Sequence, residues 1–349
     1  MATGRDIKAA FKKGTIWHTA AIAGAGDGIL ILSEGIPARL PEYLRVEEAG
    51  LPFAKSYDQG NVDISGHIDA YLRYVGLDVL MAVAMGQAGP PSQPDPVNAP
   101  TVYRNSYRLA DRLDGLFGTL VIDKGVSIWE YPSVKVLGFE LRGEAGGPVR
   151  IRFEMMADDL KRSGDEATSN TPATLSSVTF PTFGLRAMFE HMRFRINEGS
   201  GPALTDAHQV YPSSFIFRYR RIMRGEHVAD LTKTIVEPVE ERMPEVGLEL
   251  RFDRYSGDDR FNDITRNRPM KADLLFQGPV ISGGHRYEFK LLFPSLIATE
   301  ARASISGPGH IVHTVAYDAL SVETAPAGMT VMKPFQIDVQ NTRGTDPLT

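Results

Sequence analysis

The sequence has no cysteine, no long apolar run and no excess of positive charge. Because cysteine is absent from all 349 residues, disulfides, thiolate metal sites and cysteine nucleophiles are excluded. No stretch reaches the roughly 18 apolar residues of a membrane span, and the first residues lack the apolar core of a signal peptide. We therefore expect a soluble protein made in the cytosol.

The charge balance is slightly acidic. The chain has 38 Lys plus Arg against 43 Asp plus Glu, which gives a net charge of −5. A protein that binds nucleic acid tightly needs positive charge to neutralise phosphates, so that class of function is disfavoured. The length allows two ordinary domains or one large β domain.

A glycine-rich stretch, IAGAGDGILIL at residues 22–32, has the composition of a phosphate-binding loop but not its spacing. The dinucleotide fingerprint needs Gly-x-Gly-x-x-Gly, and Ile29 stands where the third glycine belongs after Gly24 and Gly26. The residues that follow are β-branched and leucine-rich up to Pro37. We interpret the stretch as a glycine turn that leads into a strand.

Alternation of apolar and polar residues is the clearest pattern in the chain. In VRIRFEM, Val149, Ile151 and Phe153 lie on one face and the charged residues on the other, as a half-buried antiparallel strand requires. In VKVLGFELRG the apolar positions shift by one residue at Leu137-Gly138, which predicts a β-bulge. The same alternation predicts strands at HIDAYLRY (67–74), FIFRYRR (215–221), LELRFDRY (248–255) and RYEFKLLF (286–293).

Helical patterns are few, so the predicted fold class is mainly β. Short helices are predicted at 76–86, ended by Gly86, and at 258–267. Stretches rich in Pro, Gly, Ser and Asp predict exposed linkers at 86–100, 161–177, 197–214 and after Glu323.

Two segments resemble each other in order and composition. YPSVKVLGFELRGEAGGPVRIRFEMMADDL (131–160) and FPSLIATEARASISGPGHIVHTVAYDAL (293–320) both run from an aromatic-Pro-Ser start through a strand, a Gly-Pro turn and a second strand. This predicts a tandem duplication of one β domain, with chance similarity of two hairpins as the alternative. The predicted domains are an N-terminal arm plus first domain at 1–172, a second domain at 173–322 and a C-terminal extension at 323–349.

Metal sites find little support in the residue spacing. His310 and His313 are three apart in GHIVH, with Asp318 further on, and residues three apart in a strand face opposite sides of the sheet. We interpret both histidines as ordinary strand residues. The acidic cluster DRYSGDDRFND lacks the EF-hand spacing and its closing glutamate, so we do not predict a calcium site from its members, Asp253, Asp258, Asp259 and Asp263.

Catalytic patterns are also missing, and we predict no catalytic, cofactor-binding or metal-binding residue. There is no Gly-x-Ser-x-Gly, and the carboxylate pairs Glu47-Glu48, Asp158-Asp159 and Glu240-Glu241 fall in turns or at strand ends, where solvated side chains are the rule. In FRYRRIMRG, alternate arginines on one strand face can meet phosphates or the carboxylates of another subunit. Because the chain is acidic, we favour a subunit interface for Arg218, Arg220, Arg221 and Arg224.

The stretch GNVDISGHIDAYLRYVGLDVLMAVAMG (60–86), with its ISG…Y…GL…LM…G entry, and the hairpin strand YPSVKVLGFEL (131–141) resemble the tail tube proteins of long-tailed bacteriophages. The resemblance covers residues 60–160 and extends more weakly through the repeat to about residue 320. It implies a β-sandwich or barrel-like domain with a short flanking helix, no enzymatic activity and no cofactor. In that family six such domains close a ring whose inner strands line a lumen, and the rings stack into a tube.

Two domains in each chain would make a pseudo-hexameric ring from three chains. The implied partners are further copies of the chain, the tape-measure and tail terminator proteins, and viral DNA that passes through the lumen without specific binding. The implied location is the virion tail, after synthesis in the host cytoplasm. The loop 86–100 and both terminal segments are expected to act as arms between rings.

Two other functions remain open at this point. One is a tube component of a secretion system, which shares the same fold. The other is a two-domain β-sandwich hydrolase or carbohydrate-binding protein that uses the clusters around Asp258 or His310.

Overall fold

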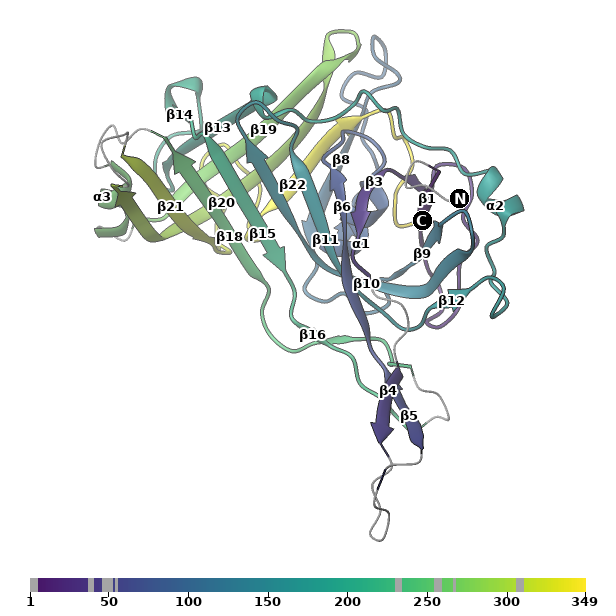
Figure 1. Cartoon of the computed structure of the whole chain (residues 1–349). Coiled ribbons are helices and arrows are strands. Elements are labelled where there is room, and N and C mark those ends of the chain that lie inside the picture. The colour runs from purple at the N-terminus through teal and green to yellow at the C-terminus, as the bar shows by residue number, and fades with distance from the viewer. Residues whose placement is uncertain are drawn as a thin grey trace.

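The computed structural model describes residues 6–36, 41–45, 53, 56–229, 234–253, 259–265, 268–305 and 311–349. The chain is mainly β, and its strands lie in two layers around one large apolar core (Figure 1). Among the described residues no helix is long and apolar enough to cross a membrane. The helices are the short segments α1 (Asp78–Met85), α2 (Pro172–Ser176) and α3 (Asp259–Thr265), with 3₁₀ turns at Phe189–His191 and Asp206–His208.

The first layer is one antiparallel sheet of eight strands, which we call the long sheet. Apolar residues on its inner face are buried in the core, and polar residues lie on its outer face, because successive side chains of a strand alternate between faces. In order of pairing its strands are β3 (Ile31–Glu34), β6 (Ile64–Tyr71), β11 (Arg150–Ala157), β10 (Ile128–Glu144), β15 (Ser214–Arg220), β18 (Glu245–Phe252), β21 (Val312–Ala319) and β20 (His285–Ser304).

The second layer forms because β10 and β20 are long enough to leave the long sheet and pair with other strands through their N-terminal halves. The N-terminal half of β10 pairs with β9 (Gly118–Asp123) and β12 (Lys161–Arg162), and β9 continues to β1 (Lys8–Lys13) and β2 (Gly28–Ile29). The N-terminal half of β20 pairs with β19 (Met270–Ser282) and β22 (Gln336–Asn341). From these the layer continues to β13 (Met192–Glu198), β14 (Gln209–Val210), β8 (Tyr103–Leu109) and β7 (Gly86–Ala88).

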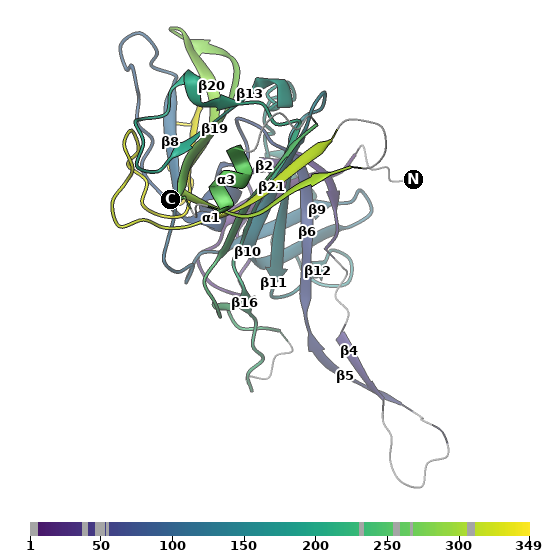
Figure 2. The ribbon, with the colours of Figure 1, turned by 90° about the vertical axis from the view of Figure 1, so that its left-hand side faces the viewer.

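Two small sheets lie outside these layers. The strands β4 (Pro41–Arg45) and β5 (Tyr57–Val62) form a hairpin that projects away from the body in both ribbon views (Figures 1 and 2). The strands β16 (Met223–Arg224) and β17 (Val239–Glu240) pair with each other between β15 and β18 along the chain.

The same order of strand pairings occurs twice. We call residues 8–162 the first unit and residues 192–341 the second unit. The strands β1, β2, β3, β6, β9, β10, β11 and β12 of the first unit pair as β13, β14, β15, β18, β19, β20, β21 and β22 pair in the second. A helix follows β6 and β18 in each case, and β7 and β8 are present in the first unit alone.

The pairing registers of the two units agree residue by residue. In the first unit Val134 lies opposite Ala157, and in the second Leu296 lies opposite Ala319. Each hairpin then has a register shift at the same place, between Val136 and Gly138 in β10 and between Ala298 and Glu300 in β20. The bulge predicted from the apolar pattern at Leu137-Gly138 is therefore confirmed.

The other local predictions are largely confirmed. Each of the five alternating segments contains a strand, and IAGAGDGILIL leads into β2 and β3 without a helix. The helix predicted at 76–86 is α1, and Gly86 ends it in the left-handed conformation with φ 88°. The helix predicted at 258–267 is α3.

The prediction of an exposed linker after Glu323 is wrong for residues 335–341. Phe335 is fully buried, and β22 pairs with β20 on one side and β8 on the other. The ring of Phe335 lies 5.0 Å from that of Phe217 and close to Tyr219 and Phe293, in an aromatic cluster that also contacts Phe139 of the first unit. The Pro and Gly residues before it mark turns, whereas the six-residue strand that they flank is part of the core.

Candidate functional site

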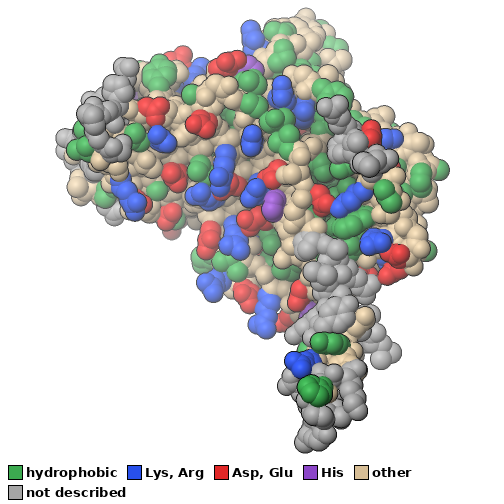
Figure 3. All heavy atoms as spheres, in the orientation of Figure 1, with side chains coloured by type: hydrophobic (Ala, Val, Ile, Leu, Met, Phe, Trp, Pro, Cys, Tyr) green, Lys and Arg blue, Asp and Glu red, His purple; other side chains and the backbone are tan. Residues whose placement is uncertain are grey.

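The outer face of the long sheet is an extended polar surface that the strand registers define. It carries arginines and carboxylates in nearly equal number, and spheres of both signs are interspersed over the face seen in Figure 3. Its arginines are Arg142, Arg150, Arg152, Arg218, Arg220, Arg251 and Arg302, and its carboxylates are Asp69, Glu140, Glu144, Glu154, Glu245, Glu249, Glu300 and Asp318.

Cross-strand ion pairs neutralise much of this face in the first unit. Arg152 on β11 donates two hydrogen bonds to Asp69 on β6, at 2.7 and 3.1 Å, and Ser33 on β3 donates a third at 2.8 Å. Burial alone would raise the pKa of Asp69, but the hydrogen bonds from Arg152 and Ser33 outweigh it and the pKa is lowered. Asp69 is therefore ionised and paired at neutral pH.

Where the two units meet, Glu140 on β10 pairs with arginines as Asp69 does in the first unit. Its carboxylate accepts a hydrogen bond from Nε of Arg218 at 2.7 Å and another from Arg142. Arg218 also lies 3.7 Å from Glu249 on β18. Burial acts to raise the pKa of Glu140, and the two arginines overcome that effect, so the pKa is lowered. Like Asp69, Glu140 compensates arginines of neighbouring strands.

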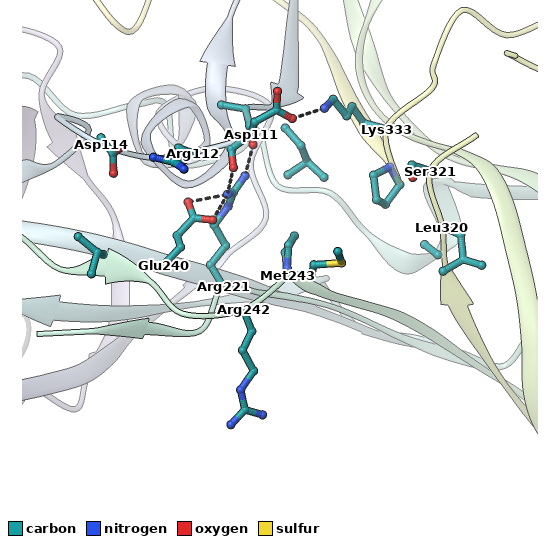
Figure 4. A pocket seen from close by; sticks show the side chains of 16 residues that line it. Asp111, Arg112, Asp114, Arg221, Glu240, Arg242, Met243, Leu320, Ser321 and Lys333 are labelled. Atoms are coloured by element: carbon teal, nitrogen blue, oxygen red, sulfur yellow. Dashed lines mark hydrogen bonds and ion pairs between the residues drawn. The ribbon is translucent and has the colours of Figure 1, made fainter. Parts of the chain in front are cut away.

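A second feature lies where the units join, at the end of β15. Arg221 is almost fully buried; it donates to the Tyr219 hydroxyl at 2.5 Å and to both carboxylate oxygens of Glu240 at 2.7 Å. It borders a pocket of about 770 Å³ that is lined by residues of the first unit, such as Asp111, and of the second, such as Lys333 (Figure 4). Arg221 also donates to the Ala110 carbonyl, and Glu240 accepts from the Leu113 amide, so the ion pair joins both residues to the loop that precedes β9.

The arginines predicted to face another subunit have carboxylate partners in their own chain. Arg218 pairs with Glu140, and Arg220 lies 3.3 Å from Glu154. Arg221 is buried with Glu240, and Arg224 lies 3.8 Å from Glu241. The carboxylate partners of these arginines therefore come from segments of the same chain that the fold brings alongside, and the predicted subunit interface stays a prediction.

Two of the carboxylate pairs are not the solvated side chains that the sequence predicted. Asp158 is fully buried, accepts hydrogen bonds from the Ser133 and Asp159 amides, and lies 3.0 Å from His18 Nδ1. Burial raises its pKa to about 6. Glu240 is the partner of buried Arg221, and Glu47-Glu48 lies outside the described residues.

The histidine and aspartate clusters that the sequence analysis considered, and did not assign to a metal, do not converge in the described part of the chain. His313 lies in β21 with its side chain buried, and Asp318 is at the other end of the same strand. No group of three His, Cys, Asp or Glu side chains able to hold a metal occurs among the described residues. His310 and Asp258 lie outside those residues, as does the side chain of Asp259.

The two edge strands of the long sheet are also part of the candidate site, because they can pair with strands of another chain. At one end β3 pairs with β6, and at the other the C-terminal half of β20 pairs with β21; the pairings of the described residues assign no strand to the far side of either. Edge strands of this kind carry unpaired amides and carbonyls that can bind another strand.

No protein-family model matches the chain, and no curated protein is significantly similar to it.

Proposed function

We propose that the chain is the structural subunit of a bacteriophage tail tube, made of two tandem tube-like domains, and that three chains form each pseudo-hexameric ring. The observation that supports this most is the repetition of one four-stranded arrangement within a single sheet. The first unit contributes β3, β6, β11 and β10, and the second contributes β15, β18, β21 and β20. Units that join edge to edge within a chain can join in the same way between chains, and repeated rotation closes a ring.

In this proposal the outer face of the long sheet lines the lumen. DNA is a dense polyanion, and a wall of unpaired arginines would hold it by releasing its counterions. On this face, Arg152 of the first unit and Arg218 of the second are instead paired with Asp69 and Glu140, respectively. Such a wall lets DNA and the tape-measure protein pass without being retained.

The remaining partners follow from the same assembly. Rings of this subunit would stack on one another and end at terminator proteins, in a virion tail assembled from protein made in the host cytoplasm. The projecting β4–β5 hairpin has the exposed side chains Leu44 and Tyr57, which makes it the described segment best placed to contact a neighbouring copy.

Negative-stain electron microscopy of the purified full chain at high concentration, together with native mass spectrometry, tests the proposal. We expect hollow tubes and a species with the mass of three chains. A discrete monomer that never assembles, and that binds small molecules or sugars in the pocket beside Arg221, would overturn it.

A further inference from the structure

We infer that the C-terminal end of β20 in one copy pairs with the end of β3 and the two residues that follow it in the next copy, in the register that β10 and β15 use inside the chain. The inference rests on the proposed ring and names the strands and residues that would close it. Its starting point is that β10 and β20, and likewise β15 and β3, hold equivalent places in the two units.

The internal junction supplies the template. Along β10 and β15, Leu141 lies opposite Phe217, Arg142 opposite Ile216, and Gly143 opposite Phe215. These residues link the first unit to the second in one antiparallel ladder. The second unit presents the same kind of edge at β20, and the pairings of the described residues assign no strand to its far side.

The residues equivalent to one side of this template are found through β21. Arg142 lies opposite Arg150 in β11, as Ser304 lies opposite Val312 in β21. With the shared bulge, Leu141 then corresponds to Ala303, and Gly143 to Ile305.

The other side is found through β6 and β18. Phe215 pairs with Leu250 of β18 as Glu34 pairs with Ile68 of β6, and Ser214 pairs with Arg251 as Ser33 pairs with Asp69. Gly35 and Ile36 then take the places of Ile216 and Phe217. Between copies, the template therefore places Ala303 opposite Ile36, Ser304 opposite Gly35, and Ile305 opposite Glu34.

The internal junction at β10 and the free edge at β20 differ in how far their apolar residues are buried. At the internal junction Leu141 is fully buried and Gly143 is buried beside the ring of Phe215. At the free edge Ala303 is exposed and the side chain of Ile305 is 75 % exposed. Both occupy positions that correspond to the core side of the sheet, so a strand from another copy would remove apolar surface from water at this place.

The template also predicts where the new ladder ends. Gly138 tolerates the close approach of β15 because it has no side chain; a Cβ there would lie 2.0 Å from the Tyr219 carbonyl oxygen. Its equivalent in β20 is Glu300. A full-length copy of the internal ladder would clash at that residue, so the junction between copies is short. Among the described residues it comprises Ala303, Ser304 and Ile305 on one side and Ile36, Gly35 and Glu34, the last residue of β3, on the other.

Engineered cysteines test this register, because the natural chain has none. The full chain carrying Ala303→Cys and Ile36→Cys is oxidised mildly at the concentration that forms rings and is analysed on a non-reducing gel. We expect a covalent trimer, formed at least about tenfold faster than in the control pair Ala301→Cys and Ile36→Cys, which is displaced by two residues, roughly 7 Å, along the strand. Equal crosslinking of both pairs would overturn the register, and a ladder that continues beyond three chains would overturn the closed ring.

A second pair of variants separates loss of pairing from loss of folding. Ala303→Asp puts a charge on the core side of the free edge, and Ser304→Asp puts the same charge on the polar face one residue away. We expect both to fold with unchanged circular dichroism, and only Ala303→Asp to lose the trimer in native mass spectra. Trimer in both variants would contradict the inference. Covalent trimers that never stack would leave the pairing intact and refute the tube, whereas tubes without in-register crosslinks would refute the pairing alone.

Discussion

Nε of Arg218 on β15 donates a hydrogen bond of 2.7 Å to Glu140 on β10, across the line where the first unit meets the second. Because Glu140 also accepts from Arg142, one carboxylate compensates two arginines. The junction of the two units and the charge balance of the proposed lumen therefore depend on the same residue.

Replacing Glu140 with glutamine is expected to make the sheet face retain DNA. Glu140→Gln leaves Arg142 and Arg218 without this carboxylate, and phosphates can then take its place. Stability should change by less than about 1 kcal/mol, because both arginines are largely exposed. Gel-shift assays with duplex DNA at low and high salt measure the effect, with binding expected at low salt only.

The control is Glu323→Gln, which removes one charge from an exposed residue beyond the long sheet. It should bind DNA no better than the natural protein. Equal retention by Glu140→Gln and Glu323→Gln would mean that net charge, and not the arginines of this face, governs the interaction.

Replacing Gly138 with alanine is expected to separate β10 from β15. The added Cβ would lie 2.0 Å from the Tyr219 carbonyl oxygen and 2.8 Å from Arg220 Cα, both on the backbone of the neighbouring strand. Neither atom can move without shifting β15, so we expect a loss of about 2–4 kcal/mol in the free energy of unfolding. Urea denaturation measures it. Gly89→Ala, where nothing lies within 4 Å, should leave stability nearly unchanged, and equal losses would refute the close approach.

Local structure was largely predictable from this sequence because it depends on residues that are close to one another in the chain. Alternation in VRIRFEM determines which side chains of β11 face the core, and the phase shift at Leu137-Gly138 marks the bulge. Both signals depend only on the two-residue period of a strand. By contrast, Phe335, Ile337 and Val339 also alternate with polar residues, but this short run follows a stretch rich in turn residues that predicts a linker, so β22 was not recognised as a core strand.

The site was less predictable, because it depends on which strands become neighbours. Nothing near Glu140 in the sequence identifies Arg218 as its partner, since the two lie 78 residues apart. The same holds for Arg221, whose burial depends on residues 110–111 and 240. The repeated aromatic-Pro-Ser hairpin was the one long-range signal in the sequence. It relates β10 and β20, which are the edge strands of the four that each unit contributes to the long sheet.

Removing Arg221 is expected to destabilise the contact between the units strongly. Arg221→Met leaves Glu240 and the Ala110 carbonyl without their buried donor. Breaking a buried ion pair from one side costs about 3–5 kcal/mol, because the remaining charge stays desolvated. Urea unfolding should show this loss, and Arg221→Met combined with Glu240→Gln should recover part of it.

Arg224→Met is the matched control for this change. Arg224 is exposed and lies 3.8 Å from Glu241, so its loss should cost less than about 1 kcal/mol. If Arg221→Met and Arg224→Met were equally stable, the buried pair would not stabilise the contact between the two units.

The buried carboxyl of Asp158 is expected to make stability fall as the pH rises through its titration. Burial raises its pKa to about 6 in the folded chain, against about 3.8 when unfolded, so between these values the folded state binds more protons. The stability linked to this proton is complete below about pH 4 and is lost as the pH passes 6. Asp158→Asn removes the titration, while its carbonyl oxygen can still accept from the Ser133 and Asp159 amides.

Urea unfolding at several pH values from 4 to 7.5 measures the difference between Asp158→Asn and the natural protein. As the pH rises, the free energy of unfolding of the variant should increase by about 2–3 kcal/mol relative to that of the natural protein, since one unit of pKa corresponds to about 1.4 kcal/mol. Asp95→Asn provides a flat control: hydrogen bonds from Asn98 lower the pKa of Asp95 below its usual 3.8, so this carboxyl titrates below the scanned range and the difference for that variant should stay nearly constant from pH 4 to 7.5. A difference for Asp158→Asn that stays constant with pH would show that this carboxyl is ionised throughout, despite its burial.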